Sequence, residues 1–373
     1  MKVLHVITNL HNGGAQEIMR QLISRTLHLE HHVVSLIDSG KLGDELRELQ
    51  IPVHELRMVN GTPGISSILE LYRIINLIKP EVVQTWLYHA DLIGGVVAKA
   101  VGVRNIIWSV HHSNVRTMPV KTRYVVKILA WLTRFIPNKI ICCSKATMLA
   151  HKQLGYQSDK LTLVLNGYDL ERYSPAIINI SDVIPNEIFS PGTVVFASIG
   201  RWHADKDIAN LVKACSIIEQ QQTLKFKCLL VGPQVDENNI ELTDLINSSG
   251  IEHCVRALGW RGDIPRVLNA IDFFVLSSSS EAYPGVVAES MACGTPCVVT
   301  DVGDAAEMVS KFGWVVPPSD SFALAKAIKK ASAEVATADW VKRKTACRSH
   351  AVKSFDQDVM VRGYLSAWSQ ASK

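Results

Sequence analysis

Residues 277–303 read "SSSSEAYPGVVAESMACGTPCVVTDVG" and place two glutamates, Glu281 and Glu289, eight positions apart. Serines precede the first glutamate, a Pro-Gly pair lies between the two, and a strand-like apolar run closes the stretch. This order predicts a strand, a loop, a short helix and a second strand. Because α/β proteins bind ligands at the carboxyl ends of their strands, the two carboxylates point to a binding site on such a fold.

The same alternation continues along the chain. Apolar runs rich in β-branched residues alternate with helical patterns, from "KVLHVIT" at 2–8 to "GWVVPP" at 313–318. The alternation predicts parallel sheets with helices on both faces. A proline-containing stretch without helical period, "SPAIINISDVIPNEIFSPG" (174–192), interrupts it.

The interruption predicts two doubly wound domains. We expect a first domain over residues 1–180, a linker over 181–192 and a second domain over 193–355. Residues 356–373 form an amphipathic pattern, and we expect a C-terminal helix that packs back on the first domain.

The composition is that of a globular protein, with 47% hydrophobic and 20% charged residues among 373. No apolar run reaches the ~18 residues of a membrane span, and the start "MKVLHVITNL" has no signal-peptide pattern, so we expect a cytoplasmic protein. The eight cysteines follow neither disulfide nor metal-site spacing and indicate buried core positions.

The net charge of +4 is unevenly distributed. Residues 92–158 contain no Asp or Glu, whereas the following cations all lie there: Lys99, Arg104, Arg116, Lys121, Arg123, Lys127, Arg134, Lys139, Lys145 and Lys152. Within "VKTRYVVKILAWLTRFIP" (120–137), helical spacing puts Arg123, Lys127 and Arg134 on one stripe, and the apolar residues opposite it are Val125, Leu129, Leu132 and Ile136. A solvated helix face and an anionic membrane contact both explain the stripe; no nucleic-acid module surrounds it.

Two strand–loop–helix patterns carry phosphate-binding features. In "VITNLHNGGAQEIMRQLI" (6–23), Gly13 and Gly14 precede a helix, without the G-x-G-x-x-G spacing of dinucleotide sites. In "FASIGRWHADKDIANLVKAC" (196–215), Arg201 and Lys206 come just before a helix N-terminus. Two cations beside free helix N–H groups favour an anion site.

Several motifs, taken in order, resemble the retaining glycosyltransferases of family 4, which have the GT-B fold. They are Gly13-Gly14, "VHHSN" (110–114), "NGYD" (166–169), "GRWHADKD" (200–207), "LGWRGDIPRVL" (258–268) and Glu281-x7-Glu289. The resemblance runs from residue 1 to about residue 355. It implies two Rossmann-like domains facing across a cleft, the first binding the acceptor and the second a nucleotide sugar.

The resemblance also implies roles in the second domain. Glu281 would contact hydroxyls of the donor sugar, and Glu289 would bind the nucleotide ribose. Arg201 and Lys206 would stabilise the charge of the leaving diphosphate, a type of contact worth about 10²–10³-fold in rate. Backbone N–H groups near Pro284, Gly285 and Val286 would assist them.

In the first domain, His111 would touch the donor sugar, with His112 as the alternative one residue away. Gly13 and Gly14 would let the backbone approach the diphosphate. The sequence departs from the family where the usual Glu-Gly-Phe-Gly is replaced by Glu281-Ala282-Tyr283-Pro284-Gly285, so contacts around the donor sugar are expected to differ.

The resemblance implies a retaining, metal-independent glycosyltransferase without a cofactor. It would move a hexose-type sugar from a nucleotide-diphosphate donor, UDP being the commonest in the family, to a glycan or lipid-linked acceptor in surface polysaccharide biosynthesis. We expect a peripheral protein on the inner face of the cytoplasmic membrane, with no nucleic-acid partner. Two alternatives remain open: a UDP-sugar 2-epimerase of the same fold, and an inactive sugar-nucleotide-binding subunit of a polysaccharide assembly complex.

Overall fold

The computed structural model describes residues 1–11, 13–58, 64–115, 118–184 and 190–370. It divides into two compact units, the first formed by Met1–Gly167 with Gln357–Lys373 and the second by Tyr168–Asp356. Residues 185–189 of the expected linker lie outside the described residues, as does Arg116 of the basic segment.

The first unit contains a seven-stranded parallel sheet in the order β3-β2-β1-β4-β5-β6-β7. Its strands are β1 (Lys2–Ile7), β2 (Glu30–Ser35), β3 (Val53–Glu55), β4 (Val82–Trp86), β5 (Asn105–Val110), β6 (Lys139–Cys142) and β7 (Leu161–Leu163). Its helices are α1 (Gly14–Arg25), α2 (Gly40–Glu48), α3 (Ile65–Ile78), α4 (Tyr88–Val101), α5 (Val120–Leu132), α6 (Lys145–Gln153) and α14 (Gln357–Gln370).

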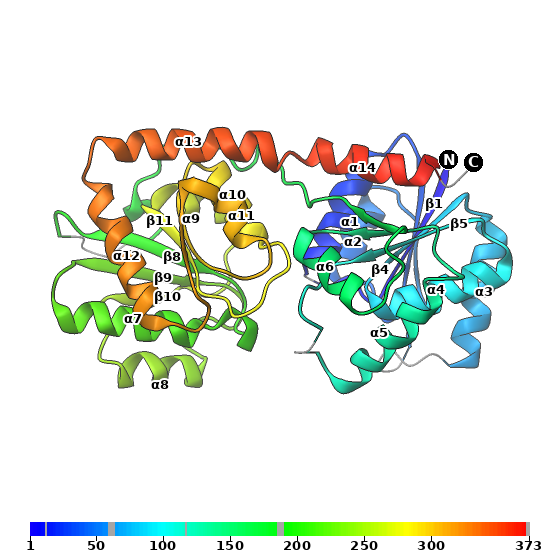
Figure 1. Ribbon diagram of the computed structural model, residues 1–373, viewed down its shortest axis with the longest axis horizontal. Coiled ribbons are helices and arrows are strands. Elements are labelled where there is room, and N and C mark those ends of the chain that lie inside the picture. Colours follow the sequence, from blue (N-terminus) through cyan, green and yellow to red (C-terminus); the bar gives the residue numbers. More distant parts are fainter. Residues whose placement is uncertain (12, 59–63, 116–117, 185–189, 371–373) are drawn as a thin grey trace. The chain divides into compact units, whose positions relative to one another are not determined.

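Two apolar clusters cover the two faces of this sheet. One contains residues of α3, α4 and α5, and the other contains residues of α1, α2 and α14 (Figure 1). The C-terminal helix α14 therefore belongs to the first unit, where it buries Met360, Tyr364 and Trp368.

The second unit contains a six-stranded parallel sheet in the order β10-β9-β8-β11-β12-β13. Its strands are β8 (Val194–Ile199), β9 (Phe226–Val231), β10 (Val255–Ala257), β11 (Phe273–Leu276), β12 (Cys297–Thr300) and β13 (Trp314–Val316). Its helices are α7 (Ile208–Gln221), α8 (Ile240–Ser248), α9 (Ile264–Ala270), α10 (Gly285–Ala292), α11 (Ala305–Val309), α12 (Ser321–Val335) and α13 (Asp339–Ser354), with 3₁₀ turns η3 (Ile180–Asp182), η4 (Ala204–Lys206) and η5 (Ser310–Phe312).

Both units are doubly wound α/β sheets, as the alternating sequence pattern predicts. The strand order reverses between β1 and β4 in the first sheet and between β8 and β11 in the second. Such reversal points are where open α/β sheets bind ligands, because neighbouring loops diverge there.

The eight cysteines are all buried and none forms a disulfide, as expected for core residues. Within the part of the chain that the structure describes, no helix has the length and apolar character needed to cross a bilayer.

Candidate active site

The loop that follows β8 carries Lys206 across the end of the second sheet. A methyl group placed on Gly200 would lie 3.3 Å from both Cδ and Cε of Lys206, so the lysine stem runs directly over this glycine. The Lys206 Nζ donates to Oε1 of Glu281 at 2.6 Å. Two residues predicted for the site from separate motifs are thus joined as an ion pair.

Glu281 is held by the segment that leaves β11. The Ser278 hydroxyl donates to the same Oε1 at 2.8 Å, and the Ser277 hydroxyl donates to the Lys206 carbonyl at 2.9 Å. The Thr300 hydroxyl, at the end of β12, donates to the Ser278 carbonyl at 2.6 Å. The side chains of Lys206 and Glu281 are only 27% and 14% exposed, so solvent screens this pair less than an exposed one.

Two glycines that the sequence analysis did not single out allow this arrangement. A Cβ on Gly232, after β9, would lie 2.0 Å from the Gly200 carbonyl oxygen. A Cβ on Gly303, after β12, would lie 2.5 Å from the carbonyl oxygens of both Glu281 and Ala282. Both glycines follow a strand end in the sequence, "LLVG" and "TDVG", which is the signal that could have identified them.

Arg201 lies in the same loop as Lys206, with an exposed side chain. Among the residues that the structure describes, its guanidinium has no hydrogen-bond or ion-pair partner. It is therefore a cation available to a ligand at the carboxyl end of β8.

Helix α10 begins at Gly285, with Pro284 as its N-cap and no side-chain cap. The N–H groups of the first turn, including those of Gly285 and Val286, have no acceptor within the helix. Glu289 lies one turn further along and is half-buried. Its charge contributes, after burial, to raising the pKa of Cys293 to about 12.

The space beside Gly285 is occupied by Tyr168. A Cβ on Gly285 would lie 3.0 Å from the Tyr168 ring, which also stacks on Tyr283 with ring centroids 6.4 Å apart. Glycine therefore gives the Tyr168 ring room to lie close to the start of α10, a contact that the sequence did not reveal.

In the first unit, His111 follows the end of β5 and contacts the ring of Trp86. Its ring stacks on Trp86 with centroids 5.6 Å apart, and its Nε2 is 3.0 Å from the Ser109 hydroxyl. Tyr364 of α14 stacks on Trp86 at 5.5 Å, and its hydroxyl is 3.0 Å from that of Ser109. Tyr364 is a supporting residue that sequence reasoning missed, because it lies 255 positions from Ser109.

Burial lowers the pKa of His111 to about 3, and the neighbouring His112 adds to this effect. His111 is therefore neutral near pH 7 and offers a hydrogen bond rather than a charge. His112 is exposed and stacks on Tyr88, with ring centroids 5.9 Å apart.

Gly13 is the N-cap of α1, and a Cβ there would lie 2.4 Å from Oε1 of Gln16, whereas one on Gly14 would meet nothing within 4 Å. Gly14 thus leaves the backbone open to a ligand. A pocket beside α1 is lined by His11, Gly13, Gln16, Glu17, Leu42 and Glu45. Its two carboxylates make this pocket itself a poor place for a diphosphate.

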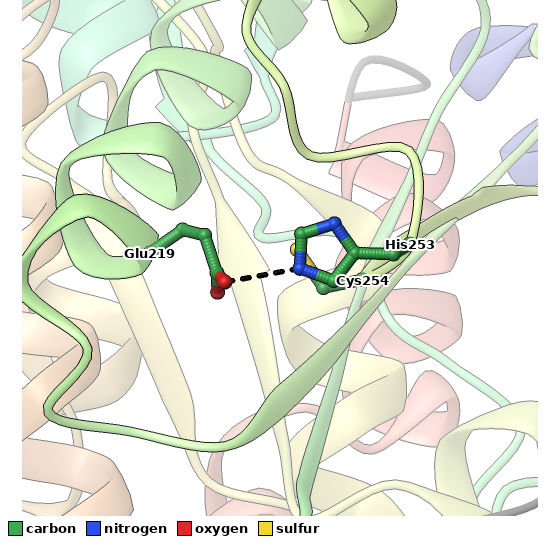
Figure 2. Close-up of side chains that lie close together, drawn as sticks. All are labelled: Glu219, His253 and Cys254. Atoms are coloured by element: carbon green, nitrogen blue, oxygen red, sulfur yellow. Dashed lines mark hydrogen bonds and ion pairs between the residues drawn. The ribbon is translucent and has the colours of Figure 1, made fainter.

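One group of potential metal ligands occurs among the described residues: Glu219, His253 and Cys254 (Figure 2). His253 Nε2 lies 3.0 Å from Glu219 Oε1, and burial raises the pKa of Cys254 to about 12. Cys254 directly precedes β10, so the group lies at the amino-terminal edge of the sheet. Arg201, Lys206 and Glu281 follow the carboxyl ends of strands and lie at the opposite edge.

Two family models match successive parts of the chain. The one described as Glycosyltransferase Family 4 matches residues 12–172, and the one described as Glycosyl transferases group 1 matches residues 193–334.

Individual relatives extend this match. The Escherichia coli UDP-Gal:alpha-D-GlcNAc-diphosphoundecaprenol alpha-1,3-galactosyltransferase is 27% identical over 317 residues, which cover 81% of this chain and 80% of that enzyme. The Campylobacter jejuni N,N'-diacetylbacillosaminyl-diphospho-undecaprenol alpha-1,3-N-acetylgalactosaminyltransferase is 24% identical over 196 residues, 50% and 49% of the two chains. The crystal structure of Anabaena HepE in complex with UDP matches with a TM-score of 0.86 at 21% identity, covering 99% of this chain and 100% of that one.

Proposed function

The chain belongs to glycosyltransferase family 4 and has the GT-B fold, and from this premise we propose that it is a retaining, metal-independent hexosyltransferase using a UDP-sugar. The observation that carries the proposal is the ion pair between Lys206 and Glu281 at the strand reversal of the second sheet. It brings a cation suited to phosphate and a carboxylate suited to sugar hydroxyls to one place.

The proposed chemistry follows from the charge that develops in the reaction. When the sugar–phosphate bond breaks, negative charge builds on the diphosphate. Arg201 and Lys206 would stabilise it, together with the first-turn N–H groups of α10. These groups supply positive charge at the leaving oxygen without a metal ion.

Retention of anomeric configuration requires attack and departure on the same face of the sugar. In the proposed mechanism the leaving phosphate accepts the proton of the acceptor hydroxyl as the new glycosidic bond forms. No dedicated protein nucleophile takes part. In the second unit, Glu281 would hold the sugar by hydrogen bonds. In the first unit, neutral His111 is the predicted sugar contact, and Gly14 is the predicted point of backbone approach to the diphosphate.

The nature of both substrates is proposed from the relatives. The Escherichia coli relative is named for UDP-Gal, and the Anabaena structure contains UDP, which supports a UDP-sugar donor. Two relatives are named for saccharides linked to diphosphoundecaprenol, which supports a lipid-linked saccharide acceptor and a place in surface polysaccharide biosynthesis. Such an acceptor would bring the enzyme to the inner face of the cytoplasmic membrane.

Donor screening tests this proposal. We expect saturation-transfer NMR to show binding of UDP-sugars in preference to GDP- and ADP-sugars. Glu289→Ala should weaken nucleotide binding at least 10-fold because the ribose loses its carboxylate partner, whereas Glu281→Ala should slow transfer while UDP still binds. Glu241→Ala, on the exposed surface of α8, is the matched control. Unchanged UDP affinity in Glu289→Ala would contradict the ribose role.

Product analysis without acceptor separates the alternatives. A glycosyltransferase should consume the donor slowly until a lipid-linked acceptor is added. Rapid release of UDP with an altered free sugar would instead identify a 2-epimerase. Tight donor binding without turnover on any acceptor would identify a binding subunit.

A further inference from the structure

The outer face of α5 and of the turn after it is apolar as well as basic. Five large hydrophobic side chains are exposed there: Val120 (55%), Tyr124 (63%), Ile128 (48%), Trp131 (58%) and Phe135 (56%). They recur every three or four residues and so share one side of the helix. The opposite side carries Val126, Leu129 and Ala130 into the core.

Cations flank this exposed stripe. Lys121, Arg123, Lys127 and Arg134 are all exposed, and residues 92–158 contain no acidic side chain to neutralise them. The Lys127 ammonium lies 5.9 Å from the centre of the Tyr124 ring, so charge and aromatic surface are interleaved.

Neighbouring helices also carry exposed apolar side chains. Helix α4 packs against both α3 and α5 on the same side of the first sheet (Figure 1). The additional exposed hydrophobic residues are Ile65, Ile68, Leu69, Tyr72 and Leu77 on α3 and Val96 on α4. The charges on α3 are mixed, with Glu70 beside Arg73, whereas the charged residues of α5 are all basic.

Exposed apolar patches of this kind are characteristic of interaction sites. The chemistry of α5 favours one occupant. Tyr and Trp beside Lys and Arg are the residues enriched at the membrane–water interface, where rings lie at headgroup level and cations meet lipid phosphates. A protein partner would need acidic groups placed against each cation, whereas an anionic bilayer supplies them everywhere.

We propose that the exposed face of α5, defined by Tyr124, Ile128, Trp131 and Phe135 with Lys121, Arg123, Lys127 and Arg134, docks on an anionic lipid bilayer. At 13 residues, or ~20 Å, the helix is too short to span the hydrocarbon core and lies in the plane of the interface. Its rings enter between the headgroups, and its cations contact lipid phosphates. The docking goes beyond the transfer reaction and requires no turnover.

Vesicle flotation tests the two parts of this surface separately. The wild type should bind phosphatidylcholine vesicles containing 30% phosphatidylglycerol, about one anionic lipid in three, at least 10-fold more tightly than neutral vesicles. Arg123→Glu/Lys127→Glu/Arg134→Glu should abolish this preference. Trp131→Ser/Phe135→Ser should reduce binding at least 10-fold even at low salt.

Matched controls lie on helices of the second unit. Lys326→Glu/Lys330→Glu/Lys353→Glu reverses three exposed cations, and Phe322→Ser/Val341→Ser removes two exposed apolar side chains. Both should bind vesicles as the wild type does. Thermal unfolding of every variant excludes loss of the fold as the cause of weaker binding.

A second measurement reports insertion directly. Brominated lipids should quench tryptophan fluorescence in the wild type, and Trp131→Phe should lose most of that quenching. Vesicle binding that is equal in the wild type and both α5 variants would overturn the proposal. So would a dimer in analytical ultracentrifugation that the α5 variants dissociate without a change in vesicle binding, because the surface would then join two copies of the chain.

Discussion

Lys206 and Arg201 lie in one loop but differ in what the protein gives them. Lys206 is paired with Glu281 at 2.6 Å, while Arg201 has no partner among the described residues. An exposed cation without an internal partner contributes little to the free energy of unfolding, since most surface substitutions change it by less than about 0.5 kcal/mol. We therefore expect Arg201 to contribute to the rate of sugar transfer instead.

We therefore predict that Arg201→Ala lowers kcat for sugar transfer by about 10²–10³-fold and leaves Tm nearly unchanged. Lys206→Ala should lower kcat similarly and also destabilise the protein, because Glu281 loses its ion-pair partner in a partly buried place. Steady-state kinetics and thermal unfolding measure the two effects. Lys213→Ala, exposed on α7, is the control. A parallel loss of Tm and activity in Arg201→Ala would mean a structural role.

At the scale of elements, the candidate site depends on strand ends that approach each other closely. Gly232 has φ +150° and lies against the carbonyl of Gly200, the residue over which the Lys206 stem runs. Any side chain at Gly232 must displace the β8 loop and, with it, Lys206.

Gly232→Ala should accordingly destabilise the protein by about 3 kcal/mol or more and weaken UDP binding. Gly250→Ala provides the comparison, because Gly250 has φ +67° with open space around it. Its free energy of unfolding should fall by only about 1–2 kcal/mol, the cost of placing an alanine in the left-handed backbone conformation. Denaturant unfolding and calorimetry with UDP measure both variants. If the free energy of unfolding fell equally in the two variants, backbone strain alone, and not contact with the β8 loop, would explain the requirement for Gly232.

Helix α5 shows how far an element can be predicted. The sequence indicated a helix with Arg123, Lys127 and Arg134 opposite an apolar core stripe, and Leu129 and Ile136 are indeed buried. The sequence analysis did not predict the second, exposed apolar stripe of α5, because this helix carries hydrophobic residues on two sides. Periodicity reveals that a stripe exists, but only packing against α4 decides which one faces the core.

At the scale of the whole molecule, the first unit encloses a chain of neutral histidines. Trp86 Nε1 donates to His5 Nδ1 at 3.2 Å, His5 and His31 share a 3.1 Å bond, and His31 Nε2 lies 3.0 Å from the Thr26 carbonyl. Because a carbonyl only accepts, His31 donates there and accepts from His5. Protonation of His5 at Nδ1 would place two hydrogen-bond donors, the new N–H and the Trp86 N–H, opposite each other.

Burial lowers the pKa of His31 and of His151 to about 4, and that of His5 well below its ordinary value. Unfolding restores a pKa near 6.5, so the unfolded chain binds more protons below that pH. The free energy of unfolding should fall as pH drops from about 6.5 to about 4, by up to ~1.4 kcal/mol per pH unit for each histidine. Asp91, whose pKa burial raises, acts in the opposite sense.

Urea unfolding at pH 7.5, 6, 5 and 4.5 measures this dependence. His151→Gln removes one buried histidine, which is hydrogen-bonded to Tyr88 and Thr147. The free energy of unfolding of this variant should therefore depend less steeply on pH, by the contribution of one histidine. A pH-independent free energy of unfolding across this range would contradict neutral burial of these histidines.

The sequence by itself determined the two parallel sheets, because strand and helix periods are local properties that repeat along the chain. It also located the loops after β8 and β11 and the residues Arg201, Lys206, Glu281 and Glu289, because cations, carboxylates and glycines at strand ends form recognisable short motifs. Their roles in binding and transfer remain predictions.

Only the tertiary structure paired Lys206 with Glu281, brought Tyr364 beside Ser109, and set Gly232 and Gly303 against the two loops. It also exposed an apolar face on α5. These contacts join residues far apart in the chain. Their formation depends on which surfaces of each element are covered when the sheets and helices pack, and local sequence patterns do not carry that information.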